Sequence, residues 1–248
     1  MNLPILYRDT WLVAVHKPPG LLVHRSQIDR RETRFALQIV RDQIGQRVYP
    51  VHRLDKPTSG ILLFALQSDI ARALAQQFEA RQVDKRYLAV VRGYCPQVGE
   101  IEHALRDKAD SRIDSAGQRC SAARDALTGY RCLATHQIPV AVDRYPQARY
   151  SLVDLRPSTG RRHQLRRHMK HIGHPIIGDA KHGKGVHNRF FAAQYGCDRL
   201  LLASYAITCK HPRSGQMLTL EAPLAGRFQR LIARFGWWQA LPAQARPP

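Results

Sequence analysis

The apolar residues of this chain are grouped in short runs of strand length, and this pattern restricts the possible folds more than any other feature. The runs are rich in Val, Ile and Leu, a composition and length typical of β-strands. They span residues 11–15, 21–23, 61–66, 87–91, 200–203 and 217–220. We therefore expect the core of the protein to be built around a β-sheet.

Helical periodicity appears between some of these runs. Ile70, Leu74 and Phe78 recur every fourth residue behind Ser68, which is suited to cap the helix. A second apolar face covers residues 36–44 and is closed by Gly45, and a third covers residues 224–235. The mixture predicts a sheet with helices packed on it, not a helix bundle or a β-sandwich.

No strong linker divides the 248 residues, so we expect a single domain over residues 1–240. Periodicity is poorest over residues 96–146, where we expect short strands joined by long loops. The segment 241–248 is rich in proline and is expected to be a frayed tail.

The charge balance points to a polyanionic partner. Lys and Arg total 39 against 19 Asp and Glu, a formal net charge of +20. Such an excess favours binding to nucleic acid, because each neutralised phosphate releases counterions. A basic protein that is merely soluble, or that meets an anionic membrane, remains an alternative. The sequence shows neither an amphipathic basic tail nor a lipidation motif that would support the membrane alternative.

The cysteines indicate a reducing compartment. Their number is odd and no pair has CxxC spacing, so neither a disulfide framework nor a zinc ribbon is expected; they are Cys95, Cys120, Cys132, Cys197 and Cys209. The N-terminus lacks the pattern of a signal peptide, and the apolar runs are far shorter than a membrane span. We therefore expect a cytoplasmic protein.

One candidate site lies in the segment His52-Arg53-Leu54-Asp55-Lys56-Pro57-Thr58-Ser59-Gly60. Pro57 restricts the residue before it, so the chain after Asp55 should turn or extend into the apolar run that follows. Asp55 is then exposed on a loop at the entrance of a core strand, between cations that favour its ionised form. Taken alone, however, a loop Asp more often caps a turn.

The second candidate site is strongly basic. Six cations and four histidines stand between Asp154 and Asp179, with no acidic residue among them. A helix beginning after Gly160 would place Arg162 and Arg166 on one face, able to grip phosphates or pair with a carboxylate. A solvated basic face is the alternative. The histidine spacing suits no common metal site, and we expect no metal.

Two shorter features complete the set. Lys17-Pro18-Pro19-Gly20 follows the first strand and predicts a tight turn. Lys85-Arg86-Tyr87 opens another strand, where Tyr87 is either a core aromatic or a ring that stacks on a flipped base.

Together these segments resemble the RluA-type RNA pseudouridine synthases. The resemblance covers roughly residues 3–222 and keeps the family's motif order. Its segments are Lys17-Pro18-Pro19-Gly20, His52-Arg53-Leu54-Asp55 with Thr58-Ser59-Gly60, Lys85-Arg86-Tyr87, and Arg156-Pro157 with Thr159-Gly160-Arg161 and His163-Gln164-Leu165-Arg166. The first segment is short and common, whereas the second and the last are specific.

The resemblance implies an α+β fold, with a mixed, largely antiparallel central sheet flanked by helices and crossed by a catalytic cleft. It implies that Asp55 is the catalytic aspartate, that Arg166 ion-pairs with it, and that Tyr87 stacks on the flipped uracil and assists proton removal. Arg53 would take the place of the displaced base and Leu165 would pack beside it. Further substrate contacts are expected from Lys17, Arg161 and His163. The reaction is an isomerisation, so no cofactor is expected.

Three segments are similar to a branch of that family that modifies a uridine in the T stem of tRNA: residues 23–26, 40–46 and 175–183. In the last, His182 stands where most members have Tyr. We expect no separate N-terminal S4-like RNA-binding module, which also fits this branch. Ala203 departs from the family, which usually has His there. A ribosomal RNA substrate, or a role in RNA binding or tRNA folding, stays open, and we expect a monomer.

Overall fold

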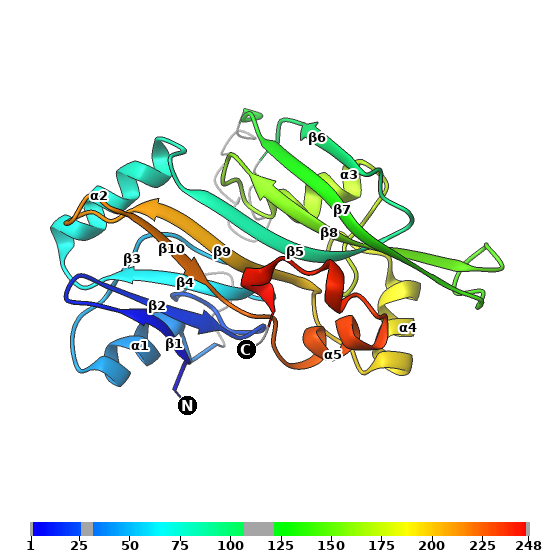
Figure 1. Ribbon diagram of the computed structural model, residues 1–248, viewed down its shortest axis with the longest axis horizontal. Helices are drawn as coiled ribbons and strands as arrows, with labels where there is room; N and C mark the ends of the chain where they lie inside the picture. Colours follow the sequence, from blue (N-terminus) through cyan, green and yellow to red (C-terminus); the bar gives the residue numbers. More distant parts are fainter. Residues whose placement is uncertain (1, 26–31, 107–121, 247–248) are drawn as a thin grey trace, which may run out of the picture.

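The computed structural model describes residues 2–25, 32–106 and 122–246, and a ten-stranded mixed sheet forms its centre (Figure 1). The strands follow the order β1-β2-β4-β9-β5-β8-β7-β6, with β10 beside β9 and β3 beside β4. Among the described strands, only β4 and β9 run parallel, and every other pairing is antiparallel. The predicted fold class is therefore confirmed.

Most of the apolar runs form strands as predicted. The strands are β1 (Ile5–Arg8), β2 (Leu12–Lys17), β3 (Tyr49–Pro50), β4 (Ser59–Ala65), β5 (Asp84–Arg92), β6 (Val98–Glu102), β7 (Leu127–Ile138), β8 (Ala148–Pro157), β9 (Leu202–Lys210) and β10 (Met217–Glu221). All seven residues of β4 are buried, which explains its unbroken apolar sequence. Residues 21–23 are an exception, because Leu22 makes only an isolated bridge to Phe35.

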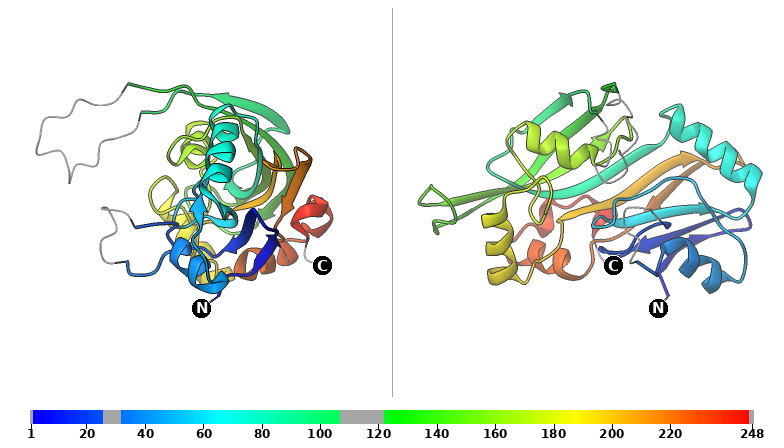
Figure 2. Two further views of the ribbon diagram at one scale, coloured as in Figure 1. Left: turned by 90° about the vertical axis from the view of Figure 1, so that its left-hand side faces the viewer. Right: turned by 180° about the vertical axis from the view of Figure 1, so that it is seen from behind.

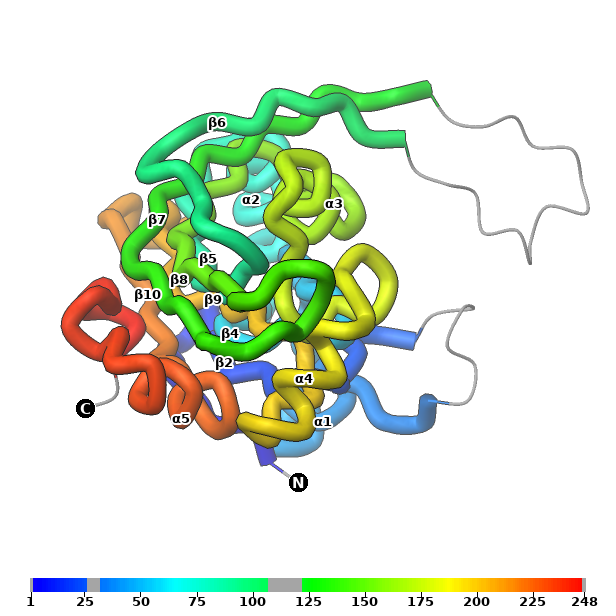
Figure 3. Tube along the Cα trace, turned by 90° about the vertical axis from the view of Figure 1, so that its right-hand side faces the viewer, coloured from blue at the N-terminus to red at the C-terminus, as the bar shows by residue number. Residues whose placement is uncertain are grey.

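Five α-helices cover the sheet among the described residues. They are α1 (Ala36–Ile44), α2 (Ser68–Glu79), α3 (Gln164–His171), α4 (Gly185–Tyr195) and α5 (Gly226–Arg234). Gly45 closes α1 in the left-handed region, as predicted. Ser68 is the first residue of α2 rather than its cap, because Gln67 occupies the capping position. Figures 2 and 3 show α3 and α5 on opposite faces of the sheet.

The stretch with poor periodicity contains a longer strand than predicted. β7 has 12 residues and pairs with both β6 and β8. Its buried and exposed positions alternate irregularly, because its register with β8 shifts between Cys132 and Ala134. Residues 107–121, which belong to the same predicted stretch, lie outside the described residues.

The end of the chain packs on the sheet up to residue 246, which differs from the expected fraying. Leu241 and Ala245 are buried in the same cluster as α5, and the Leu224 amide donates to the Ala245 carbonyl oxygen at 2.9 Å. Two short 3-10 helices, Trp238–Ala240 and Ala243–Ala245, carry these contacts. No helix in the described part of the chain is long and apolar enough to cross a bilayer.

Candidate active site

Asp55 lies on the loop between β3 and β4, at the entrance of a core strand as the sequence predicts. The Thr58 amide donates to the Asp55 carbonyl oxygen at 3.0 Å and closes the turn, while Leu54 is buried beneath it. Gly60 permits the approach of β4 to β9: its φ is +110°, and a Cβ atom there would lie 1.9 Å from the Ser204 carbonyl oxygen. The Asp55 side chain keeps 18% of its surface exposed.

Arg166 joins Asp55 to a second carboxylate. Its Nη1 donates to Asp55 Oδ2 at 3.0 Å, and its Nε and Nη2 donate to Asp179 at 2.7 and 2.8 Å. Asp179 is completely buried and also accepts the backbone amides of Lys181 and His182. The guanidinium is thereby held by a bidentate pair on one edge while its other edge faces Asp55.

The pKa of the Asp179 carboxyl lies below its usual value. Burial acts to raise this pKa, but the hydrogen bonds and charge of Arg166 and the two backbone amides outweigh burial. The sequence offers one signal for this residue: Asp179 is the first acidic residue after the acid-free basic stretch. The motifs described above assign no role to Asp179, because its pairing with Arg166 of α3 depends on the tertiary structure.

The helix α3 begins later than the sequence predicts, at Gln164. The Gln164 side chain explains this start, because its Oε1 accepts hydrogen bonds from Thr159 Oγ1 at 2.7 Å and from the Arg161 amide at 3.0 Å. Arg162 therefore precedes the helix, and the predicted face shared by Arg162 and Arg166 does not exist. Leu165 and Met169 are both buried within the helix.

His163 lies between Asp55 and a second histidine. Its backbone is left-handed, with φ +54°. Its Nδ1 is 2.9 Å from His182 Nε2, and its Nε2 is 3.9 Å from Asp55 Oδ2. Burial lowers the pKa of His163 to about 4, although the charge of Asp55 acts in the opposite direction. The imidazole is therefore neutral at pH 7.

Tyr87, Leu165 and Leu54 belong to one buried apolar cluster, called the apolar floor below, and of the three only Leu54 lines the cavity beside Asp55. Tyr87 comes from β5 and Leu165 from α3, and both belong to one buried cluster. Burial, followed by the negative charge of Asp55, raises the pKa of Tyr87 to about 12. The phenol is therefore protonated at neutral pH and cannot serve as a base in the resting state.

The predicted contact between Lys17 and the substrate is wrong, because the Lys17 side chain is buried. It is completely buried, and its Nζ donates to the carbonyl oxygens of Pro18, Leu21 and Lys56 at 2.9, 2.8 and 3.1 Å. Burial lowers its pKa to about 7. With no exposed surface, Lys17 fastens the tight turn at residues 18–21 to the loop of Asp55.

A cavity of about 320 Å³ opens beside Asp55. Basic side chains line much of it, and the full set is Leu22, Val23, His24, Arg25, Arg53, Leu54, Asp55, Lys56, Pro57, Arg162, His163 and Arg166. Arg53 is exposed here, whereas Arg161 lies outside this set and donates from Nε to the Asp125 carbonyl oxygen at 3.0 Å. Arg162 of the basic stretch also lines the cavity, as do His24 and Arg25 of the segment 23–26, although the resemblance gives none of the three a role in the site.

Ala203 lies away from this cavity. It is 4% exposed on β9, opposite Ser59 of β4 and Leu88 of β5. Its small side chain packs in the core on the far side from α3, in the cluster that contains α5. In the described part of the chain, no group of three His, Cys, Asp or Glu side chains is placed to hold a metal ion.

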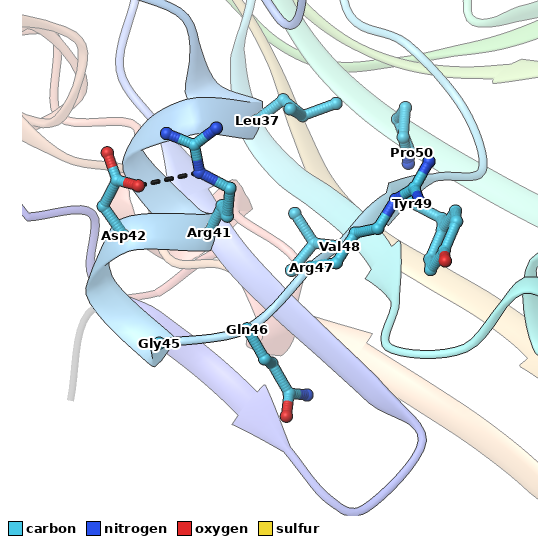
Figure 4. Close-up of a pocket in the computed structure, with 9 residues that line it drawn as sticks. All are labelled: Leu37, Arg41, Asp42, Gly45, Gln46, Arg47, Val48, Tyr49 and Pro50. Carbon is cyan, nitrogen blue, oxygen red and sulfur yellow. Dashed lines mark hydrogen bonds and ion pairs between the residues drawn. The ribbon is translucent and has the colours of Figure 1, made fainter.

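A separate groove lies between the end of α1 and β3 (Figure 4). Arg41 is paired there with Asp42 at 2.7 Å, and Arg47 stacks over Tyr49 at 5.0 Å. Of the described residues that line this groove, none belongs to the candidate sites predicted from the sequence. The convergence of a carboxylate, a shared arginine and an apolar floor is found instead beside Asp55.

Comparisons with known proteins find a matching family model and similar chains. A family model described as RNA pseudouridylate synthase matches residues 11–171. The chain is 53% identical over 240 residues to a tRNA pseudouridine synthase C of Pectobacterium carotovorum subsp. carotovorum, covering 97% of this chain and 64% of that protein. It is 51% identical to a tRNA pseudouridine synthase C of Yersinia pestis, covering 95% of this chain and 91% of that protein.

The fold has a solved counterpart of similar size. The structure of human RNA pseudouridylate synthase domain containing 4 superposes with a TM-score of 0.71 at 26% sequence identity. The match covers 94% of this chain and 93% of the human one.

Proposed function

The chain belongs to the RNA pseudouridylate synthase family and is thus an RNA-modifying isomerase, and we propose that it acts on a uridine in the T stem of tRNA with Asp55 as its catalytic carboxylate. The observation that carries this proposal is the Asp55 carboxylate, which lies 3.0 Å from the Arg166 guanidinium at the edge of a basic cavity.

The reaction is balanced without a cofactor. The N1–C1′ bond breaks, the uracil turns, a C5–C1′ bond forms, and a proton leaves C5 while N1 gains one. A carboxylate can open this sequence in two ways, as a nucleophile at C1′ or as a base at C2′. Both routes use the carboxylate form of Asp55, and the positive Arg166 guanidinium lies 3.0 Å from it.

The arginine is held rigidly, which supports this role. Its two hydrogen bonds to buried Asp179 fix the guanidinium plane before substrate arrives. A charge that is already oriented in a dry site costs no reorganisation during the reaction. Asp179 therefore acts as a positioning residue, because it reaches Asp55 only through Arg166.

Tyr87 and His163 are suited to handle the protons of the reaction and the hydrogen bonds of the substrate. Tyr87 is a neutral phenol on the apolar floor, suited to stack on the uracil and to pass on a proton rather than to take the first one. His163 is neutral and its Nε2 is 3.9 Å from Asp55 Oδ2. It is therefore placed to hydrogen-bond the substrate beside the carboxylate.

The surroundings suit an extruded nucleotide. Moving a base out of its stack costs a few kcal/mol, which phosphate contacts can offset. Arg53 is exposed at the cavity beside Asp55 and is positioned to fill the gap left by the base.

The relatives that carry the name tRNA pseudouridine synthase C support tRNA as the substrate. We infer that the protein works in the cytoplasm as a single catalytic domain, in which the segment up to residue 246 packs beside residues 1–240.

Tritium release tests the catalytic assignment. tRNA labelled with tritium at uracil C5 should release tritium with the wild type and none above background with Asp55→Asn. Asp42→Asn is the matched control, because Asp42 is an exposed acid paired with an arginine on α1. Undiminished release by Asp55→Asn would remove Asp55 from the mechanism.

Mapping pseudouridines in a deletion strain tests the substrate. The T-stem pseudouridine of tRNA should disappear and return when the wild-type chain is supplied. A preserved T stem with a missing ribosomal pseudouridine would reassign the substrate to ribosomal RNA. Full rescue of the deletion phenotype by Asp55→Asn would instead make RNA binding the important activity.

A further inference from the structure

A second pocket lies at the end of the sheet where the β7–β8 hairpin turns. Four segments enclose about 510 Å³: residues 92–94 at the end of β5, residues 143 and 145–149 of the hairpin, Gly173 after α3 and His187 of α4. Figures 1 and 3 show the hairpin turn close to α4 at this end of the molecule. Among the described residues, none that lines this pocket lines the cavity of Asp55, so the two are separate sites.

Two exposed tyrosines with stacked arginines mark the pocket. Tyr94 is 44% exposed with the Arg149 guanidinium 5.2 Å from its ring centre, and Tyr145 is 51% exposed with Arg144 at 4.9 Å. Flat rings beside cations are typical of surfaces on which nucleobases stack while phosphates are neutralised. Arg92 adds another cation to the wall.

The acidic residue in the wall does not cancel this charge. Asp143 forms an ion pair with Lys184, which immediately precedes α4. Asp143 is also within electrostatic reach of Arg92, but Arg92, Arg149 and Lys184 outnumber this one carboxylate, so the wall keeps a net positive charge for an anion. A nucleotide carries both the anion and the flat ring that this combination accommodates.

His187 supplies a hydrogen-bonding group without a partner. It is 4% exposed, its Nδ1 is 2.8 Å from the Tyr150 hydroxyl, and its Nε2 has no partner among the described residues. His187 Nδ1 is also the one hydrogen-bond partner of the fully buried Tyr150 hydroxyl in the described structure. That hydroxyl therefore donates to Nδ1, which leaves the proton of the neutral imidazole on Nε2.

The Nε2–H group of His187 favours ligands that carry a hydrogen-bond acceptor. Burial, followed by the charge of Arg92, lowers the pKa of His187 to about 4, so the ring stays neutral and keeps a single donor. A buried donor without an acceptor is costly, and a ligand that supplies an acceptor relieves this cost. The carbonyl oxygens and ring nitrogens of nucleobases are such acceptors.

The pocket is within reach of an RNA bound at the catalytic site. Tyr87 and Arg92 stand on the same strand, β5, and five residues of extended chain span ~17 Å. The helix α3 makes the same connection, since Arg166 lies near its start and Gly173 follows its end. With one phosphate per ~3.4 Å of helix axis on each strand, this separation corresponds to about five base-pair steps.

We propose that this pocket binds one unpaired nucleotide of the substrate RNA, whose base stacks on Tyr94 or Tyr145 and accepts a hydrogen bond from His187 Nε2. The inference rests on the proposed function, because the same RNA presents its uridine to Asp55. The pocket contributes to holding the RNA and takes no part in the chemistry.

The test removes both rings in a double variant, Tyr94→Ala with Tyr145→Ala. Both side chains are exposed, so their truncation leaves the core intact. Filter binding should show the Kd for tRNA raised at least about fivefold, the ratio equivalent to ~1 kcal/mol of lost stacking. KM should rise in parallel while kcat is unchanged. Arg149→Gln should act in the same direction.

Arg213→Gln is the matched control. Arg213 stacks over Trp11 at 5.2 Å, a similar pair outside the pocket, and its loss should leave the Kd within twofold of the wild type. An unchanged Kd and KM in the double variant would overturn the proposal. A rise as large in Arg213→Gln would also overturn it, because the effect would then reflect general charge and stacking.

A free nucleotide is the other source of the same chemistry. Equilibrium dialysis with AMP and with UMP distinguishes a free nucleotide from a nucleotide of the RNA. If the wild type binds AMP or UMP and the double variant does not, while the Kd of the double variant for tRNA is unchanged, the assignment to RNA is overturned. Failure of the proposed function has a different signature. In that case the wild type releases no tritium from tRNA, whereas failure of the pocket alone leaves turnover and KM normal in the double variant.

Discussion

Arg166 is shared by two carboxylates, and replacing the buried one by Asp179→Asn should weaken both the fold and the catalytic arrangement. Asp179 accepts four hydrogen bonds, two from Arg166 and two from the backbone amides of Lys181 and His182. Asparagine has the same shape but lacks the charge, and its amide group can accept only on one side. Part of the Arg166 charge is then left buried without compensation.

The stability cost of Asp179→Asn follows from the burial of the ion pair between Arg166 and Asp179. The side chains of Arg166 and Asp179 are 6% and 0% exposed. Removing one partner of such a pair costs ~3–5 kcal/mol. Asp55 keeps its contact with Arg166 at 3.0 Å and offsets part of the loss, so we expect a decrease near the lower end, ~3 kcal/mol, in the free energy of unfolding.

The pH dependence has a defined sign. The folded-state pKa of Asp179 lies below its usual value of 3.8, so the stabilisation is fully present above that value and is lost as pH falls through the folded pKa. The difference between wild type and variant should therefore be constant from pH 8 to about pH 5 and shrink at lower pH.

Urea unfolding of wild type, Asp179→Asn and Asp198→Asn measures the effect. Asp198 forms an exposed ion pair with Arg227, with side chains 60% and 47% exposed, and its loss should cost less than ~1 kcal/mol. Turnover of folded Asp179→Asn should fall while its Kd for tRNA stays near that of the wild type. A cost no larger than that of Asp198→Asn, or normal turnover, would refute the role given to Asp179.

Three further outcomes follow from the same structure. His52 accepts the Leu63 amide at Nε2, and burial lowers its pKa from 6.5 to about 4. The unfolded chain therefore binds the proton first, and between pH 6.5 and 4 the free energy of unfolding should fall by roughly 3 kcal/mol less in His52→Gln than in the wild type, whose His163 and His187 add their own losses. Gly60→Ala should cost at least ~3 kcal/mol in urea unfolding, because its Cβ would meet the Ser204 carbonyl, whereas Gly45→Ala, with open space around it, should cost ~1 kcal/mol. Tyr87 has a pKa raised to about 12, so the pH–rate profile should show no titration of this phenol below about pH 11, and Tyr87→Phe should lower turnover by ~10²-fold.

Local sequence determined the features that depend on neighbouring residues. Pro57 and Gly60 shape the turn that carries Asp55 into β4, and the apolar run that follows is buried along its whole length. Gly45 ends α1 for the same kind of reason, since a left-handed residue stops a helix without help from distant parts of the chain. These predictions succeeded because the controlling atoms lie within a few residues of each other.

The start of α3 marks the limit of such reasoning. Its side-chain bonds lead from Gln164 to Leu127 and Thr128, more than thirty positions earlier, and they set where the helix begins. A charge pattern alone placed Arg162 on the helix. The tail behaves likewise, because Ala245 is ordered by pairing with Leu224 and not by its own sequence.

The motifs of this chain, by themselves, supplied the carboxylate, the cations and the resemblance that names their chemistry. Tertiary structure alone decided which of them meet: Arg166 reaches Asp55 across 111 positions and is held there by Asp179, while Lys17 is withdrawn from the surface. The physical reason is that desolvation and charge pairing depend on distance in space. A sequence records which groups are available, and only packing brings a buried arginine within 3.0 Å of the acid it serves.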